Sequence, residues 1–185
     1  MIKAEEYLTQ QELAALGLGS CGRNVFISRR AVIGYPAALH LGHSIRIDAF
    51  SSIIGRGRVQ IGDYGHVGTS VTISASAPVS IGSFCGLASG ARLFTSDDDY
   101  GGAWLTGPTV PAETTNVEVA PISIASYCVV GANSIVLPAT VLEEGAVIGA
   151  LSLVRGHYPE WAIYGGIPAR RLRERTREAK TRLAD

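Results

Sequence analysis

Short repeated units dominate the sequence of this chain. Three blocks of equal length, starting at Cys21, Leu41 and Ile61, align as CGRNVF-ISRRAV-IGYPAALH, LGHSIR-IDAFSS-IIGRGRVQ and IGDYGH-VGTSVT-ISASAPVS, and a fourth block starts at Ile81 and breaks off. From Ile124 the pattern returns in units of six, as IASYCV-VGANSI-VLPATV-LEEGAV-IGALSL. Most units open with Ile, Leu or Val. A period of six with this pattern predicts a parallel β-helix.

The six-residue unit has a geometric basis. A short strand covers one face of a prism and a tight corner turns the chain onto the next face, so three units form one coil of about 18 residues. The aliphatic residue that opens each unit points toward the axis. The residue four positions later also points inward but lies near a corner, where a small side chain fits. Inward positions of this second kind include Ala31, Ser51, Val71, Cys85, Ala91, Cys128, Ser134 and Ala146. The expected fold class is an all-β solenoid of hexapeptide repeats.

Composition and charge fit one domain with an aliphatic core. The 185 residues are 46% hydrophobic but only 7% aromatic, and 22 glycines supply the many corners. The formal net charge is zero, which argues against a nucleic-acid binder. No apolar run approaches the roughly 18 residues that span a bilayer, and the N-terminus lacks a signal-peptide pattern. Three cysteines, two of them at inward positions, lead us to expect a reduced, cytoplasmic protein that has no membrane partner.

A short helix is expected before the repeats, within residues 1–20. Thr9 and Glu12 have the spacing of a capping box, in which each residue's side chain bonds to the other's backbone amide. This pattern predicts a helix over about residues 9–16. We expect this helix to cover the open end of the solenoid.

The remaining chain divides into repeats and a C-terminal segment. The β-helix is expected over residues 21–157, with an aperiodic excursion rich in Thr, Gly, Pro and Asp over 95–120. Residues 158–185 contain a Gly-Gly-Ile-Pro turn at 165–168. After that turn, the basic residues predict a helix over about 169–182 that caps the second end.

The excursion holds an unusual polar group, the run of Asp97, Asp98 and Asp99. It also contains Tyr100, Trp104 and two prolines, which favours an ordered loop that packs on a surface such as a neighbouring subunit. Three adjacent carboxylates fit a solvated turn, a cation-binding group or a general base. Because side chains alternate in an extended segment, at most two of the three can converge on one site.

The C-terminal half, PISIASYCVVGANSIVLPATVLEEGAVIGALSLVRGHYPEWAIYGGIPARRL, resembles the hexapeptide-repeat acyltransferases, and the resemblance covers roughly residues 7–180. It implies a left-handed β-helix and a homotrimer with active sites between adjacent subunits. It also implies acetyl-CoA or another short acyl-CoA as co-substrate, no permanently bound cofactor, and a sugar hydroxyl or amine as acceptor. The opening YLTQQELAALGLGSCGRNVFISRRAVI and the loop SDDDYGGAWLTGPTVP are similar to the sugar or galactoside acetyltransferase-like branch. That branch includes N-acyltransferases of nucleotide-linked aminosugars.

The position at which galactoside-type enzymes carry a catalytic histidine corresponds to Asp98 in this chain. An imidazole suits a base for a sugar hydroxyl, whereas a carboxylate is a weaker base unless burial or a second carboxylate assists it. An amine acceptor needs less help, because it attacks once neutral and sheds its proton afterwards. We therefore expect an amine acceptor and a catalytic role for Asp98 or Asp99, and the substrate itself is a further candidate base.

His66 is the alternative catalytic base, since it ends the unit IGDYGH at an outward-facing corner. His40 and His43 lie near a corner of another coil, and three histidines invite comparison with the γ-type carbonic anhydrases of similar fold. A catalytic zinc needs three converging ligands. His43 and His66 do not share a repeat position and the carbonic anhydrase spacing is absent, so no metal site is expected.

The resemblance also implies where CoA binds. The pantetheine arm would lie in the groove between subunits and contact backbone at Ala132 and Ala150. Its phosphates would contact Arg155, Arg170 and Arg173, because guanidinium groups suit phosphate oxygens.

Tyr100 and Trp104 are the candidate substrate-binding residues. The competing function is a non-catalytic trimeric β-helix scaffold, which would need neither the acidic excursion nor the arginine-bearing tail. The xenobiotic acetyltransferases are the next enzyme class in similarity. They typically carry an Asn-His pair in the excursion, and this pair is missing here.

Overall fold

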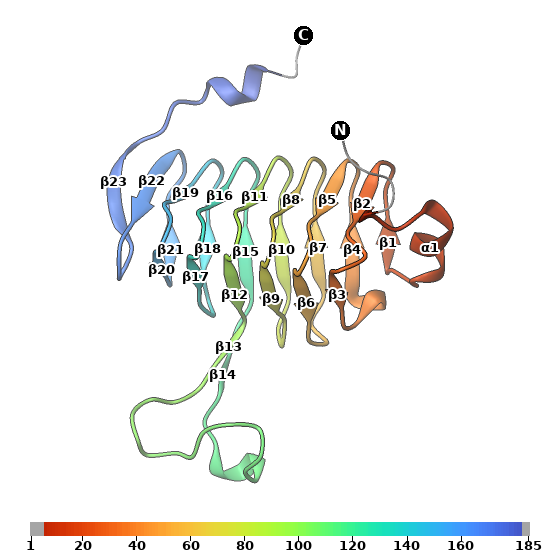
Figure 1. Cartoon of the computed structure of the whole chain (residues 1–185). Helices are drawn as coiled ribbons and strands as arrows, with labels where there is room; N and C mark the ends of the chain where they lie inside the picture. Colours follow the sequence, from red (N-terminus) through yellow and green to blue (C-terminus); the bar gives the residue numbers. More distant parts are fainter. Residues whose placement is uncertain (1–5, 183–185) are drawn as a thin grey trace.

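The computed structural model describes residues 6–182 and forms a parallel β-helix with three long sheets (Figure 1). The first sheet consists of β1 (Ser20–Cys21), β4 (Leu39–Leu41), β7 (Val59–Ile61), β10 (Val79–Ile81), β15 (Ile122–Ile124), β18 (Val141–Leu142) and β21 (His157–Tyr158). The second consists of β2 (Val25–Ile27), β5 (Ile45–Ile47), β8 (His66–Val67), β11 (Gly86–Leu87), β16 (Val129–Val130), β19 (Val147–Ile148), β22 (Ala162–Gly165) and β23 (Arg170–Glu174).

The third long sheet and a short two-stranded ribbon complete the architecture. The third long sheet consists of β3 (Val32–Ile33), β6 (Ser52–Ile54), β9 (Thr72–Ser74), β12 (Arg92–Phe94), β17 (Ile135–Val136) and β20 (Leu153–Val154). A separate ribbon pairs β13 (Ser96–Asp97) with β14 (Glu118–Val119). The helical elements with described bounds are α1 (Gln10–Ala15) and the 3₁₀ turns η2 (Pro36–Ala38), η3 (Ala112–Thr114) and η4 (Glu178–Thr181).

The strand register follows the repeat in the sequence. Leu39 of β4 pairs with Val59 of β7, and Val59 pairs with Val79 of β10, so each of these coils uses one of the longer blocks. After the excursion, Ser123 of β15 pairs with Val141 of β18, and this shorter step corresponds to three hexapeptides. These pairs are parallel, as a strand that returns to the same prism face in each coil must be. The predicted hexapeptide β-helix is confirmed.

The inward positions predicted from the repeat form the core. All of the small inward residues are buried except Ala31, which lies in the first coil and is partly buried. Two of the buried ones carry a hydroxyl group. Ser51 donates a hydrogen bond to the carbonyl of Gly68, and Ser134 donates one to the carbonyl of Gly149, each at 2.8 Å. Both hydroxyl groups are therefore satisfied, as burial requires.

Aromatic rings stack along one corner of the solenoid. The rings of Tyr64 and Phe84 lie 4.8 Å apart, those of Phe84 and Tyr127 4.9 Å apart, and those of Tyr127 and Trp161 6.0 Å apart. All four residues have a left-handed backbone, with φ between 48° and 63°. Gly145 occupies the same corner between Tyr127 and Trp161. A Cβ atom on it would lie 2.5 Å from the indole of Trp161, so the indole fills the space above this glycine.

The N-terminal helix forms with its predicted capping box. The hydroxyl of Thr9 accepts a hydrogen bond from the amide of Glu12, and the carboxylate of Glu12 accepts one from the amide of Thr9. Leu13 of α1 belongs to the buried core, and α1 lies at the N-terminal end of the solenoid (Figure 1). No helix within residues 6–182 is long and apolar enough to cross a membrane.

The C-terminal segment differs from the prediction. The coils continue to β22, beyond residue 157, and the basic stretch expected as a helix over 169–182 forms the strand β23 and the short turn η4. β23 pairs antiparallel with β22. The helix prediction was wrong because the last coil leaves a strand edge with free backbone groups. Pairing with that edge satisfies its free backbone groups and covers it, which a separate helix would not do.

The excursion leaves the coils after β12 as the ribbon of β13 and β14. Its loop projects away from the solenoid and returns to β15 (Figure 1). Within the loop, the amide of Leu105 donates a hydrogen bond to the carbonyl of Thr114 at 2.9 Å. The excursion thus has an internal structure, although most of it extends beyond its own coils.

Candidate active site

The acidic run lies where the excursion leaves the coils. Asp97 ends β13, and Asp98 and Asp99 follow it. Asp98 lines three adjoining hollows of about 500, 290 and 340 Å³. The largest of them lies against outward side chains of the third sheet and its corners, which are Phe94, Ile135, Leu137 and Leu153. Asp98 therefore faces open space on several sides.

Hydrogen bonding distinguishes Asp98 from Asp99. The carboxylate of Asp99 accepts bonds from the amide of Gly101 at 2.6 Å and from Nδ2 of Asn116 at 3.2 Å. The bond from Gly101, followed by that from Asn116, lowers the pKa of Asp99. The side chain of Asp98 has no hydrogen-bond partner within residues 6–182. Asp99 thus stabilises the loop, whereas the carboxylate of Asp98 is available to a ligand.

The two predicted substrate-binding residues occupy different places. Tyr100 lines two of the hollows beside Asp98, and its hydroxyl donates a hydrogen bond to Oδ1 of Asp97 at 2.7 Å. Trp104 lines none of these three hollows and is 46% exposed in the excursion, next to the exposed Leu105. Exposed apolar side chains on a projecting loop are typical of a contact surface.

His66, the alternative base, belongs to a polar cluster on the second sheet. Its Nε2 lies 2.7 Å from Oδ2 of Asp48, and Nη2 of Arg46 lies 3.0 Å from the same oxygen. The hydroxyl of Tyr7 donates a hydrogen bond to Oδ1 of Asp48 at 3.1 Å. Burial raises the pKa of Asp48, but the hydrogen bonds from His66, Arg46 and Tyr7 outweigh burial and hold it below its usual value. The imidazole of His66 itself is 46% exposed.

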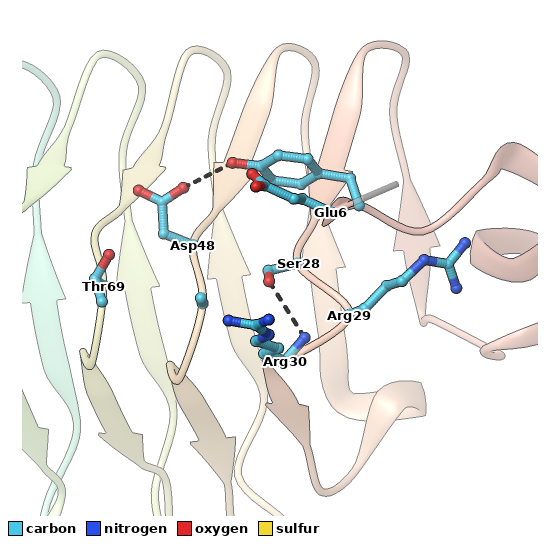
Figure 2. Close-up of a pocket in the computed structure, with 8 residues that line it drawn as sticks. Glu6, Ser28, Arg29, Arg30, Asp48 and Thr69 are labelled. Atoms are coloured by element: carbon cyan, nitrogen blue, oxygen red, sulfur yellow. Dashed lines mark hydrogen bonds between the residues drawn. The ribbon is translucent and has the colours of Figure 1, made fainter. Parts of the chain in front are cut away.

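A hollow of about 520 Å³ lies beside Asp48, where the N-terminal segment crosses a corner of the first coils (Figure 2). In Figure 2 the carboxylate of Asp48 points toward the hydroxyl of Tyr7, whereas the side chain of Arg29 points away from the hollow. Arg29 instead forms a bidentate pair with Glu12, in the first turn of α1. Arg30 and Thr69 also line this hollow.

The sequence predicted His66 but not the cluster around it, although the repeat contained a signal. Arg46 and His66 occupy the same position in successive blocks and pair in register between β5 and β8. The length of the repeat therefore places them side by side. Asp48 follows Arg46 closely at the end of the same strand, so a carboxylate next to this pair could also have been found. Tyr7 could not, because it precedes the repeats.

The other histidines do not join this cluster. Nδ1 of His40 lies 3.3 Å from the hydroxyl of Ser20, and Nδ1 of His43 accepts a hydrogen bond from the amide of Arg23 at 2.9 Å. Within residues 6–182 no group of three or more His, Cys, Asp or Glu side chains is placed to hold a metal ion. His40, His43 and His66 thus have separate partners.

Four of the residues predicted to contact CoA lie toward the C-terminal end of the solenoid. Ala132 and Ala150 occupy one corner in successive coils, where the carbonyl of Ala132 accepts a hydrogen bond from the amide of Leu151 at 2.9 Å. Arg170 and Arg173 lie on β23, with exposed side chains. These two guanidinium groups are therefore accessible to an anionic ligand.

Arg155, the fifth predicted CoA contact, has partners in its own chain. Its guanidinium forms an ion pair with Glu118 of β14, and Nη1 lies 3.7 Å from Oδ2 of Asp97 in β13. The structure thus places Arg155 at the base of the excursion, together with the acidic run.

Two proteins of Escherichia coli are similar to this chain over most of its length. The first is a dTDP-4-amino-4,6-dideoxy-D-glucose acyltransferase, which is 34% identical over 93% of this chain and 90% of that enzyme. The second, from strain K12, is provisionally assigned as a lipopolysaccharide biosynthesis O-acetyltransferase. It is 32% identical over 84% of this chain and 78% of that protein. No family model matches the sequence.

A solved structure is similar over nearly the whole chain. It is the N-acyltransferase AntD of Bacillus cereus in complex with dTDP and 3-hydroxybutyryl-CoA. The two share a TM-score of 0.91 and 31% identity, over 95% of this chain and 93% of that one. This chain belongs to the hexapeptide-repeat acyltransferases. Like other members of the family it is a left-handed β-helix. It is an acyltransferase that acts on a sugar and uses acyl-CoA as co-substrate, so the scaffold alternative is not supported.

Proposed function

We propose that this acyltransferase transfers an acetyl or other short acyl group to the amino group of a dTDP-linked 4-amino-4,6-dideoxy sugar. The observation that carries the proposal is the likeness, along nearly the whole chain, to an acyltransferase named for such a sugar and to an N-acyltransferase solved with one. The free carboxylate of Asp98 supports an amine acceptor, because it can attract an ammonium group by charge and accept its proton.

The proposed reaction is a direct transfer. The acceptor ammonium first loses a proton to Asp98, which passes it to solvent. The neutral nitrogen then attacks the thioester carbonyl carbon and forms the C–N bond, while a backbone amide stabilises the oxyanion. The C–S bond breaks, and the departing thiolate of CoA takes up the second proton that the nitrogen releases. The products are an amide and free CoA.

The proposed enzyme is a homotrimer in which the excursion of one protomer reaches the coils of the next. Trp104 and Leu105 are exposed on a loop that projects from its own coils, which supports a contact with a second copy. The backbone at Ala132 and Ala150 would contact the pantetheine arm, and Arg170 with the neighbouring Arg173 would contact phosphates. The cytoplasmic location stays a prediction, which fits the three free cysteines.

His66 is the second candidate for the base. Its pairing with Asp48 favours this role, because a carboxylate on one imidazole nitrogen leaves the other nitrogen able to accept a proton. The cluster lies on the second sheet, whereas Asp98 follows the ribbon that leaves the third. In the proposed trimer, His66 of one protomer would face the excursion of another.

The proposal is tested by measuring CoA release and the mass of the product. Acetyl-CoA and 3-hydroxybutyryl-CoA serve as donors. The acceptors are dTDP-4-amino-4,6-dideoxyglucose, the same aminosugar without the nucleotide, and dTDP-glucose, which carries a hydroxyl at the same position. We expect amide formation only with the nucleotide-linked aminosugar. Asp98→Asn should lower kcat by about 10²–10⁴-fold, the usual contribution of a general base. Turnover of the hydroxyl sugar in preference to the aminosugar would overturn the proposal.

A further inference from the structure

We propose that Arg155 is a positioning residue that fixes the base of the excursion and thereby holds Asp98 at the reacting centre. This inference rests on the proposed role of Asp98. It gives Arg155 a different role from the phosphate contact that the family resemblance implies. The two roles predict opposite kinetic effects, so they can be separated by experiment.

The excursion needs such a residue because its base carries facing negative charges. Asp97 and Glu118 are cross-strand partners in the antiparallel ribbon of β13 and β14. Like charges directly opposite one another on such a ribbon repel and weaken the pairing. Arg155 forms ion pairs with both carboxylates, so one guanidinium offsets this repulsion.

Arg155 is itself held by the coils. It directly follows β20, which is paired with β17 in the third sheet. Its backbone amide donates a hydrogen bond to the hydroxyl of the buried Tyr158 at 3.3 Å. The guanidinium therefore extends from a well-anchored strand to the projecting excursion. This contact therefore fixes the excursion relative to the coils.

Besides Arg155, a hydrogen bond of 3.2 Å from the hydroxyl of Ser76 to that of Ser96 joins the ribbon to the coils, and the ribbon itself is short. Each of its strands has two residues, and an isolated two-stranded ribbon is marginally stable in water. One further backbone bond joins its two ends, from the amide of Ala120 to the carbonyl of Thr95 at 3.0 Å. Asp97 also accepts a hydrogen bond from Tyr100, which follows the acidic run. Fixing Asp97 through Arg155 therefore fixes the segment that contains Asp98.

The kinetic test uses the full-length enzyme with Arg155→Gln. Because a misplacement of about 1 Å can cost about 10²-fold in rate, we expect kcat to fall by about 10–100-fold. The KM for acyl-CoA should change less than about threefold, since no contact with the donor is lost. A phosphate contact predicts the reverse, a KM that rises about tenfold or more with kcat retained, and this result would overturn the inference. Arg58→Gln, which removes an exposed arginine near the first sheet, is the charge-matched control.

Rescue provides a second kinetic arm. Adding Glu118→Gln to Arg155→Gln removes the repulsion that Arg155 offsets, so the double variant should recover kcat to within about threefold of the wild type. A residue that acts only by binding CoA would show no such recovery. Equal loss of kcat in the single and double variants would contradict the positioning role.

A protease assay tests the inference without activity. Chymotrypsin can cleave the excursion after Tyr100, Trp104 and Leu105, and mass spectrometry locates the cut. Arg155→Gln should increase the rate of cleavage there several-fold, and Glu118→Gln should reverse the increase. An unchanged rate would overturn the inference. If the wild type does not turn over the aminosugar, the proposed function fails, whereas this assay still decides the role of Arg155.

Discussion

Replacing Trp161 by alanine tests how the C-terminal end of the solenoid is held together. The indole is 2% exposed, fills the space above Gly145 and packs 6.0 Å from the ring of Tyr127. Three cations also lie 5.5–5.7 Å from the indole, namely Arg175, Arg177 and Lys180. Loss of a buried Trp side chain costs about 3–5 kcal/mol in the free energy of unfolding. We expect a loss in this range, because the cation contacts belong to the same set and do not add independently.

Glycine at the same position separates packing from backbone strain. Residue 161 has φ of 48°, in the left-handed region. A side chain there costs roughly 1–2 kcal/mol, whereas glycine adopts this conformation freely. Trp161→Gly should therefore be at least as stable as Trp161→Ala. This order is the reverse of that in ordinary helices and strands, where glycine is the less stable of the two.

Thermal unfolding followed by circular dichroism measures both effects. For a chain of this size about 1 kcal/mol shifts Tm by about 2–4 °C, so Trp161→Ala should lower Tm by about 6–20 °C. Trp161→Phe keeps a ring over Gly145 and serves as the control, with a smaller loss. All variants are compared at one protein concentration, because assembly would add to the apparent stability. A Tm within about 2 °C of the wild type for the alanine variant would refute the packing argument. A glycine variant that melts clearly below the alanine variant would refute the strain argument.

The remaining predictions concern the acidic run and the N-terminal helix. Asp98→Asn should lower kcat by about 10²–10⁴-fold. Asp99→Asn should lower it by less than about tenfold, because the carboxylate of Asp99 holds Gly101 and Asn116 in the loop. A larger fall in kcat for Asp99→Asn than for Asp98→Asn would identify Asp99 as the base. The hydrogen bonds from Arg29 and Thr9 lower the pKa of Glu12 from 4.5 to about 2. Since the folded pKa lies below the unfolded one, the stabilisation is complete above about pH 4.5 and is lost as the pH falls toward 2. The Tm difference between wild type and Glu12→Gln should shrink over this range, and a difference independent of pH would contradict the ion-pair argument.

Local periodicity made the coils predictable. Each hexapeptide assigns its own residues to the axis or to the outside, so the burial of Ser51, Val71 and Ala146 followed from position alone. The capping box at Thr9 and Glu12 is local in the same way, since its two members lie within one helical turn. The acidic run could be singled out because it interrupts the period. Which of its carboxylates faces open space depends on bonds from Gly101 and Asn116, which the pattern does not contain.

The helix predicted over residues 169–182 was wrong because its structure depends on a contact outside that segment. Residues 169–182 carry many arginines and no strong strand pattern, and nothing within them records that the last coil presents an unpaired edge. β23 forms because β22 offers that edge. The partner of Arg155 was missed for a similar reason, since Glu118 lies far away in the sequence, across the end of the excursion and two intervening coils.

The sequence by itself determined the solenoid, its coil length, its inward residues and the place where the coils are interrupted. Each of these depends on spacing between neighbouring residues along the chain. Only the tertiary structure decided that Asp48 joins Tyr7 to His66, that Arg155 contacts the acidic ribbon and that the tail forms a strand. These contacts join outward-facing groups from different coils and from segments outside the repeat. A period of six fixes which residues face outward, but it does not specify which of them meet.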